Sequence, residues 1–493
     1  MDQLKSDHNH STQISNNSSF HRSENLIFVI SVCLISSLGG FLVGFDTGVI
    51  NGTFDGLYSV FGSNHVASGF NVTAILLGGA AGALLSGLFV DRLGRRSMLI
   101  VAANFLVISA WGAGITDSSI GFILYRMLGG IAIGVLSVIT PIYIAEIAPS
   151  QYRGRLIGLQ YMAILLGLLS ASLSNDVLVN IAGKSTHLLW LDAEAWRWMF
   201  WIELFPAFLF LFLLFFIPES PRFLAAIGNQ RAAHEVLIRL HGQQKAASVV
   251  AKLKLTLPLT HYPTMADLLE NGQKRIKSVL WLALALAALQ QLMGINVIYY
   301  YGVVLWQGVG FSETDTLLIT IITGMVSIAG CCLTLIFIDK CGRKPFLIIG
   351  SMGMTLTLGL IVYAFANAEF GLNGELNLGT YDWLALISAN VYVFFFSLSW
   401  GPVTWTLLAE MFPQKIRGLG MALSGCTLWL VHYVMIRSFP FLLKVFGLAQ
   451  TYSFYCLFTL FSVLLLLRYI HETKRQTLED IHQFELIPIP LYK

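Results

Sequence analysis

The sequence predicts an all-α membrane protein with twelve transmembrane helices in two pseudo-symmetric six-helix bundles. Its composition, the spacing of its apolar runs and the repetition of motifs between its two halves support this fold class. Of its 493 residues, 56% are hydrophobic and 12% are charged, whereas soluble domains average about 45–50% apolar and about 25% charged residues. Apolar runs of roughly 20 residues recur, and each is long enough to cross a hydrocarbon core of about 30 Å.

The apolar runs predict six helices in each half, with a polar stretch between the halves. The first bundle, 26–217, is expected to hold helices near residues 26–50, 70–90, 97–115, 120–145, 156–176 and 197–217. The second bundle, 278–470, is expected to hold helices near residues 278–304, 316–338, 345–366, 383–409, 418–440 and 450–470. Residues 218–277 carry the helical pattern "RAAHEVLIRLHG" and are expected to form a cytoplasmic helical linker. Residues 1–25 are polar and predicted to be disordered, and residues 471–493 form a tail.

Basic residues predict the orientation of the helices. They cluster in "DRLGRR", "YRGR", the linker, "DKCGRK", "QKIRG" and "ETKR", whereas the alternate loops 51–69, 116–119, 305–315 and 367–382 contain no Lys or Arg. Because loops rich in Lys and Arg stay on the cytoplasmic side, both termini and the linker are expected in the cytoplasm. We therefore expect an integral plasma-membrane protein, with a bacterial inner membrane as its setting.

Two motifs occur once in each half. "DRLGRR" (91–96) recurs as "DKCGRK" (339–344), and "AEIAPSQYRG" (145–154) recurs as "AEMFPQKIRG" (409–418). The same motifs at corresponding positions indicate a duplicated six-helix unit with one orientation. Transporters built in this way place the substrate site near the midplane between the halves, and one half rocks against the other.

The motifs resemble those of the sugar porter family of the major facilitator superfamily. The matching segments are "GFDTGVING", "DRLGRR", "PIYIAEIAPSQYRGR", "PESPRF", "QQLMGINVIYYYG", "DKCGRK", "LLAEMFPQKIRG" and "HETKRQTLED", which stand in family order between about residues 26 and 482. The resemblance implies the major facilitator fold, and it is nearest to bacterial proton-coupled sugar and polyol symporters of the xylose or myo-inositol type. No cofactor is expected.

Three charged residues lie inside spans of the first half: Asp46, Arg126 and Glu203. Given a rise of about 1.5 Å per residue and the predicted orientation, all three lie at a similar depth in the outer part of the bundle. An ionised side chain at a helix centre costs about 2.5–3.5 kcal/mol, so Asp46 is expected to pair with Arg126. The pair could merely fix helix packing. The resemblance instead implies that Asp46 carries a proton, that Arg126 modulates its affinity and that Glu203 assists.

Eight further charges lie at the inner helix ends. The basic ones could simply orient the short loops, but the acids at repeated spacing need another explanation. The resemblance implies that they form a salt-bridge latch that gates the inner side. They are Asp91, Arg95, Glu146, Arg153, Asp339, Arg343, Glu410 and Arg417.

Polar side chains in the seventh span predict the substrate site. Amides both donate and accept hydrogen bonds, as sugar hydroxyls do, although an isolated amide in a membrane helix often serves helix packing. The resemblance adds two tryptophans that pack on a sugar ring, although a membrane Trp can also belong to an interfacial belt. The candidates are Gln290, Gln291, Asn296, Tyr300, Trp405, Trp429, Tyr161, Gln160 and Ser327.

Four of the positions depart from glucose and xylose carriers. Tyr161 stands where those carriers have a glutamine, with Gln160 one place earlier, and Leu168, Ser327 and Leu428 replace further amides. These losses are expected to weaken a hydrogen-bond set shaped for glucose. The segments "TWTLLAEMFPQKIRGLGMALSG" and "LWLVHY" are more similar to bacterial polyol carriers of the myo-inositol type.

The leading hypothesis is a proton-coupled symporter of a monosaccharide or cyclic polyol (xylose, myo-inositol or a hexose). A facilitative uniporter and a non-transporting sugar receptor are the alternatives, although the termini are short for a signalling receptor. No nucleophile–base constellation or metal-ligand cluster is present in the sequence, so neither an enzyme nor a metal site is expected. The net charge of +3 predicts no nucleic-acid partner. The expected partners are the sugar or polyol, a proton and the lipid bilayer, with the monomer as the working unit.

Overall fold

A computed structural model gives the structure of the chain. It describes residues 23–62, 65–243, 246, 264–269, 276–299, 306, 313–370, 376–413 and 416–474. The first-half elements are α2 (Ser23–Phe61), α3 (His65–Leu93), α4 (Arg95–Ile115), α5 (Ser119–Ile147), α6 (Arg153–Ala182), β1 (Leu188–Trp190), β2 (Ala193–Glu194), α7 (Ala195–Ile202) and α8 (Leu204–Leu213). Next come α9 (Pro221–Ala226), α10 (Gln230–His241) and η1 (Met265–Leu268). The second-half elements are α12 (Ser278–Leu292), α14 (Glu313–Cys341), α15 (Arg343–Ala366), β3 (Glu369–Phe370), β4 (Leu376–Asn377), η2 (Gly379–Tyr381), α16 (Asp382–Leu398), α17 (Trp400–Met411) and α18 (Arg417–Tyr469).

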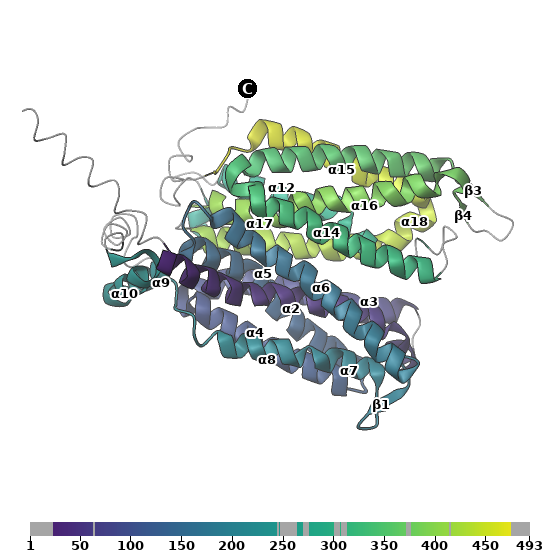
Figure 1. Cartoon of the computed structure of the whole chain (residues 1–493), viewed down its shortest axis with the longest axis horizontal. Helices are drawn as coiled ribbons and strands as arrows, with labels where there is room; N and C mark the ends of the chain where they lie inside the picture. Colours follow the sequence, from purple (N-terminus) through teal and green to yellow (C-terminus); the bar gives the residue numbers. More distant parts are fainter. Residues whose placement is uncertain are drawn as a thin grey trace, which may run out of the picture.

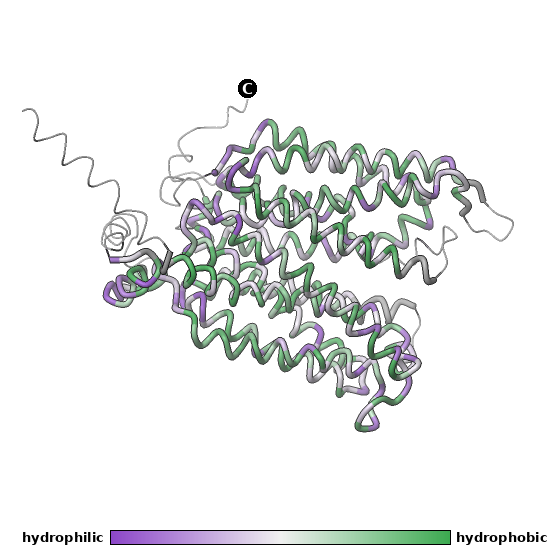
Figure 2. Tube along the Cα trace, in the orientation of Figure 1, coloured by the Kyte–Doolittle hydropathy of each residue, from purple (hydrophilic) through white to green (hydrophobic). Residues whose placement is uncertain are grey.

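The helices form two bundles that lie side by side. Helices α2 to α8 make one bundle, and helices α12 to α18 make the other (Figure 1). Helices α9 and α10 lie at one end of the first bundle, and we call this the linker end. The start of α2 and the end of α18 lie at the same end (Figure 1), as an even number of crossings requires. Hydrophobic residues dominate the middle of the helices, and hydrophilic residues gather toward their ends (Figure 2).

The twelve predicted crossings are confirmed. In the described chain, 11 helices are long and apolar enough to span a membrane, and the last, Arg417–Tyr469, has 53 residues. At about 1.5 Å per residue that helix is more than twice as long as a hydrocarbon core is thick. Gly447, with φ 79° and ψ 175°, divides it into two crossings.

Several helices extend beyond their apolar runs. The first was expected to end near residue 50 but continues to Phe61, and the fifth continues to Ala182 rather than residue 176. An apolar run marks the stretch inside the hydrocarbon, whereas backbone hydrogen bonding can continue the helix into the polar region. The two-stranded hairpins β1–β2 and β3–β4 occupy loops of the first and second half.

Prolines break two of the spans that were expected to be continuous. The sixth span is interrupted at Glu203 between α7 and α8, because Pro206 has no N–H to donate to the carbonyl of Ile202, although the backbone at Glu203 stays helical with φ −60° and ψ −26°. The tenth span divides at Ser399 into α16 and α17, and Pro402 likewise leaves the carbonyl of Leu398 without its helical donor. The hydroxyl of Thr334 donates to that carbonyl at 2.5 Å instead.

The seventh span breaks at Gly294. Helix α12 ends at Leu292, and Gly294 has a φ of 89°, which favours glycine. The helix resumes from Ile295 to Tyr299, and the expected residues 300–304 lie outside the described part of the chain. The break therefore separates Gln290 and Gln291 from Asn296.

The two bundles share their cores across a seam. Trp405, Trp429 and other second-half residues belong to the apolar cluster that is otherwise built from first-half helices. Tyr161 of α6 packs against the cluster of the second half, next to Gly401, where the absence of a Cβ leaves room for its ring. Each bundle thus contributes side chains to the interior between them.

Candidate functional site

Asp46 and Arg126 form a buried ion pair. They come from α2 and α5, and their relative exposures are 2% and 1%. Nη1 of Arg126 donates to Oδ1 of Asp46, and Nη2 lies 3.5 Å from the Asp46 carbonyl oxygen. The guanidinium also lies 5.5 Å from the ring centroid of Phe200 on α7. The pairing expected from the sequence is thus present in the structure.

Glu203 lies beside this pair at the break between α7 and α8. It is 1% exposed, and Asp46 and Arg126 are its electrostatic neighbours. Within the described residues, neither carboxylate oxygen of Glu203 has a hydrogen-bond partner, and neither does Oδ2 of Asp46. Two carboxyl groups therefore share one guanidinium away from water. Because burying a net charge is costly, this cluster is balanced when one of the two acids holds a proton.

Two buried glutamine side chains, one in each half, have an oxygen that accepts no hydrogen bond among the described residues. Gln290 on α12 donates from Nε2 to the carbonyl of Trp400 at 2.9 Å, and Gln160 on α6 donates to the carbonyl of Leu136 at 3.4 Å. Both side chains are 3% exposed. Their Oε1 atoms have no donor among the described residues. Each amide is thus held by its nitrogen and leaves its oxygen for another donor.

Other polar candidates are already engaged with one another. Asn296 donates from Nδ2 to Oε1 of Gln291 across the break in the seventh span. The Tyr299 hydroxyl lies 2.8 Å from Oγ of Ser327, which donates to the carbonyl of Thr323 at 2.8 Å. Tyr300 lies outside the described residues.

Both candidate tryptophans are buried between the bundles. Trp405 and Trp429 are 9% and 7% exposed, unlike tryptophans of an interfacial belt. Nε1 of Trp429 donates to Oγ of Ser137 on α5 at 3.1 Å, which links the second half to the first. Leu428 beside it is also buried.

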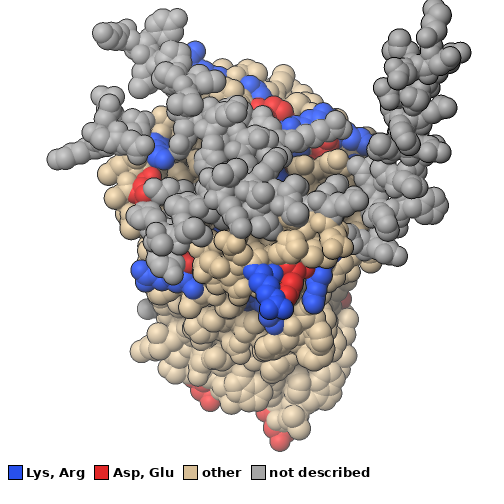
Figure 3. Space-filling model, turned by 90° about the vertical axis from the view of Figure 1, so that its left-hand side faces the viewer, with Lys and Arg blue, Asp and Glu red and all other residues tan. Residues whose placement is uncertain are grey.

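Each bundle carries the same charge triad at the linker end. In the first half, Arg95 bridges Asp91 at 3.0 Å and Glu146 at 3.1 Å. In the second half, Arg343 bridges Asp339 at 3.0 Å and Glu410 at 2.7 Å. Figure 3 views the molecule from this end, where Lys, Arg, Asp and Glu side chains gather. These ion pairs join helices within one half and do not themselves cross the seam.

Asp339 also crosses the seam. It accepts the backbone N–H of Gly154 at 3.1 Å and that of Arg155 at 3.0 Å. A carboxylate at these amides is favoured by the positive N-terminal end of α6. We call this contact the latch. At the corresponding place of the other half, Asp91 lies beside Gly418 at the start of α18.

The remaining two members of the predicted charge set lie at the same helix starts. Arg153 and Arg417 begin α6 and α18 and are 5% and 2% exposed. Arg417 donates from Nη2 to the carbonyl of Phe412 at 3.1 Å. All eight charges are thus near the linker end, in two similar sets.

A second pair of acids, which was not predicted from the sequence, lies at this end. Glu219 accepts the backbone N–H groups of Arg95 at 3.0 Å and Arg96 at 3.1 Å. Glu472 accepts those of Arg343 at 2.9 Å and Lys344 at 3.0 Å. Burial raises the pKa of Glu219 even though these hydrogen bonds oppose the shift.

A residue with a hydroxyl group follows each of these acids, and it donates a hydrogen bond to the glutamate of the triad in the same half. Ser220 donates to Oε2 of Glu146 at 2.5 Å, and Thr473 donates to Oε2 of Glu410 at 2.6 Å. The signal was present in the sequence. "PESPR" and "HETKR" each place Glu, a hydroxyl and an Arg in the same order after the last helix of a half.

The fold and the site define a membrane transporter built from a duplicated six-helix unit. The family model for "Sugar (and other) transporter" matches residues 32–484. The chain belongs to the sugar porter family of the major facilitator superfamily.

Three relatives illustrate the range of the family. The chain is 42% identical to the glucose transport protein of Synechocystis, covering 93% of this chain and 97% of that protein. It is 34% identical to the D-xylose-proton symporter of Escherichia coli, with coverage of 93% and 96%. It is 30% identical to the major myo-inositol transporter IolT of Bacillus subtilis, with coverage of 94% and 95%.

The fold is that of the proton:xylose symporter XylE. The structure of XylE bound to 6-bromo-6-deoxy-D-glucose matches with a TM-score of 0.84 at 32% identity, covering 93% of this chain and 99% of XylE. The inward-open conformation of XylE from E. coli matches with a lower TM-score of 0.68. This structure is therefore less similar to the inward-open arrangement.

Asp339→Ala is expected to loosen the start of α6. The variant removes both latch hydrogen bonds, and bonds to a charged group contribute about 1.5–3 kcal/mol each. Losing even one should speed amide exchange at Gly154 and Arg155 about ten- to a hundredfold. Hydrogen–deuterium exchange resolved to single amides measures this rate. Asp382→Ala, at the start of α16, is the matched control and should leave these two amides unchanged; an unchanged rate in Asp339→Ala contradicts the assignment.

Proposed function

We propose that this protein is a proton-coupled symporter of a monosaccharide or cyclic polyol that works by alternating access. The observation that carries the proposal is the buried cluster of Asp46, Arg126 and Glu203, with two acids against one cation. The protein acts as a monomer in a plasma membrane, here a bacterial inner membrane, with its termini and linker end in the cytoplasm.

Asp46 is the proton carrier in this proposal. Arg126 cannot lose its proton, so the change of charge falls on an acid. When Asp46 binds a proton, its ion pair with Arg126 weakens, and Glu203 remains as the partner of the guanidinium. When Asp46 loses the proton, the pair forms again.

The substrate lies at the seam between the bundles. The free Oε1 atoms of Gln160 and Gln290 accept hydrogen bonds from two hydroxyls, one on each side of the seam. Trp405 and Trp429 supply apolar faces for the ring, while Gln291, Asn296 and Tyr300 complete the polar wall of the second half. Tyr161 and Ser327 support this wall through their contacts with second-half side chains. Because the ligand contacts both bundles, a movement of one bundle relative to the other breaks some of its contacts and allows its release.

The latch and the triads serve the rocking movement. Each triad ties together helices of one bundle, which lets that bundle move as a unit. The latch joins the two bundles at the linker end and must open before substrate leaves toward the cytoplasm. The latch contacts support a state whose cytoplasmic side is closed.

Asp46→Asn is expected to abolish accumulation of substrate against its gradient while leaving counterflow detectable. The amide cannot take up a proton, but it keeps the size of the side chain. Uptake into proteoliposomes under an imposed pH gradient is the measurement. Asp176→Asn, an exposed residue of α6, makes the same chemical change and should transport normally. Accumulation by Asp46→Asn would overturn the role of Asp46.

The same preparation separates the alternatives. A symporter alkalinises the external medium when substrate is added, whereas a facilitative uniporter equilibrates substrate without any pH change. A receptor binds substrate and gives neither uptake nor counterflow.

Gln290→Ala is expected to weaken substrate binding about five- to a hundredfold, since an unpaired buried partner costs about 1–3 kcal/mol. Titration of binding in detergent, together with the KM of counterflow, measures this loss. Gln450→Ala on the exposed side of α18 is the matched control. An unchanged affinity in Gln290→Ala would assign this glutamine to helix packing alone.

The substrate preference is expected to favour a ligand with one hydroxyl-rich edge. Leu168, Leu428 and Ser327 reduce the polar contacts that a hexose could use, so D-xylose or myo-inositol should outcompete D-glucose. The 42% identity to a glucose transport protein instead favours a hexose. Competition among the three labelled substrates decides between them. D-glucose as the best substrate, with no gain from Leu428→Gln, would contradict the expectation.

A further inference from the structure

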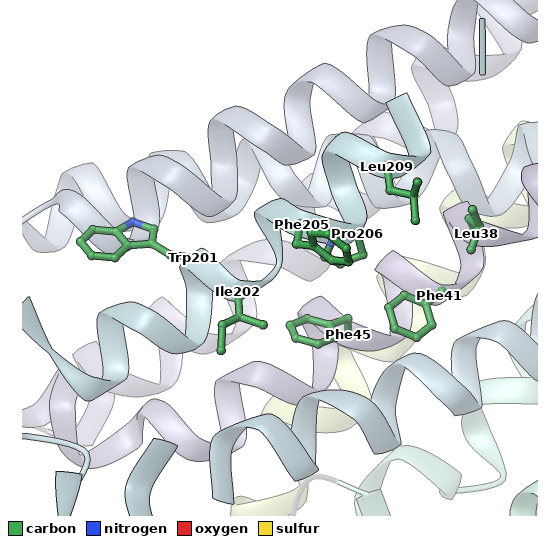
Figure 4. A pocket seen from close by; sticks show the side chains of 8 residues that line it. All are labelled: Leu38, Phe41, Phe45, Trp201, Ile202, Phe205, Pro206 and Leu209. Carbon is green, nitrogen blue, oxygen red and sulfur yellow. The ribbon is translucent and has the colours of Figure 1, made fainter. Parts of the chain in front are cut away.

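An apolar cavity of about 500 Å³ lies between α2 and the broken sixth span. Leu38, Phe41 and Phe45 line it from α2, and Trp201, Phe205 and Leu209 line it from α7 and α8. Figure 4 shows Phe41 and Phe45 of α2 near Phe205 and Pro206 of α8, with the ring of Trp201 turned away from them. The cavity is distinct from the seam that holds the proposed sugar site.

The break in the sixth span places these side chains around the cavity. Residues 38, 41 and 45 follow a helical spacing that puts them on one face of α2. Residues 201, 205 and 209 are four apart and make the opposite stripe, which passes through the break at Glu203. Pro206, also in the lining, causes this break.

The mouth of the cavity opens on the lipid-facing surface. Phe205 and Leu209 are 77% and 42% exposed, and Phe208 and Phe212 on the same helix are 54% and 60% exposed. In a membrane-spanning helix such residues face the acyl chains. The cavity is therefore continuous with the interface between protein and bilayer.

Its chemistry excludes polar occupants. The lining side chains are apolar except for the indole N–H of Trp201, which already donates to the carbonyl of Trp111 at 3.3 Å. A water needs two to four polar partners to be held in a cavity, and a sugar would lose the hydrogen bonds of its hydroxyls. We propose that the cavity is a binding site for one acyl chain of a bilayer phospholipid.

The bound chain would complete the wall behind the buried acids. Phe45 precedes Asp46, and Ile202, which also lines the cavity, precedes Glu203. An acyl chain packed here separates the two acids from the bilayer at this point of the sixth span. The lipid site does not depend on the proposed function, because it rests on the shape and lining of the cavity alone.

Native mass spectrometry of the full chain tests this site. The protein is reconstituted in phosphatidylethanolamine–phosphatidylglycerol vesicles and extracted in a detergent that removes the loosely held lipids. Wild type is expected to keep one phospholipid per chain. The double variant Leu38→Trp, Leu209→Trp fills the cavity and should reduce the lipid-bound fraction at least tenfold.

A matched pair of substitutions controls for the added indoles. Leu356→Trp with Leu360→Trp places them on the exposed face of α15, outside the cavity, and should retain the lipid. If the cavity-filling variant does not fold, quenching of Trp201 by a phosphatidylcholine brominated on its acyl chains replaces it, with Trp201→Phe as the reference. Wild type without a retained lipid, equal retention in both double variants, or Trp201 quenching no greater than that of the lipid-facing Trp281 would overturn the proposal.

Discussion

An ionised side chain inside the hydrocarbon needs an oppositely charged partner within the protein, and much of this structure depends on that constraint. Asp46 finds Arg126, and Glu203 has no cation of its own. The first pairing lowers the cost of placing Asp46 in the hydrocarbon, and the surplus acid is the group on which the proposed proton coupling rests. At the linker end the same constraint gives a different result, because Arg95 and Arg343 each bridge two acids, and Glu146 and Glu410 each accept a hydroxyl as well.

Breaks in the helices bring backbone irregularity to the places where polar chemistry is needed. Glu203 lies at the break of the sixth span, Gln291 and Asn296 lie on either side of Gly294, and Trp400 follows the break at Ser399. Irregular backbone is tolerated at membrane depth only where protein groups satisfy it. The Thr334 hydroxyl that covers the carbonyl of Leu398 does this for the tenth span. The interruption of the sixth span also lies beside the bilayer-facing cavity, and Pro206 lines that cavity.

The sequence was sufficient for what depends on composition and on repeated spacing. Apolar runs fixed the number of crossings, and matching motifs located both charge triads. The partner of Asp46 followed from depth alone. The helix breaks did not follow, because a proline in a membrane span can be accommodated without dividing the helix. Hydrogen bonds between distant segments of the chain could not be predicted from the sequence either. No sequence pattern predicts that Asp339 binds the amides of Gly154 and Arg155. None predicts that Trp429 binds Ser137, which is 292 residues away.

Glu219 and Glu472 each follow the last span of a half. Their carboxylates accept backbone N–H groups at the start of the third helix of the same half. Each six-helix unit is thereby closed at the linker end by an acid that follows its last span, Glu219 at the start of the linker and Glu472 at the start of the tail. The same contact occurs in both halves, so the repeated unit includes the short segment that follows its sixth helix as well as the six helices themselves.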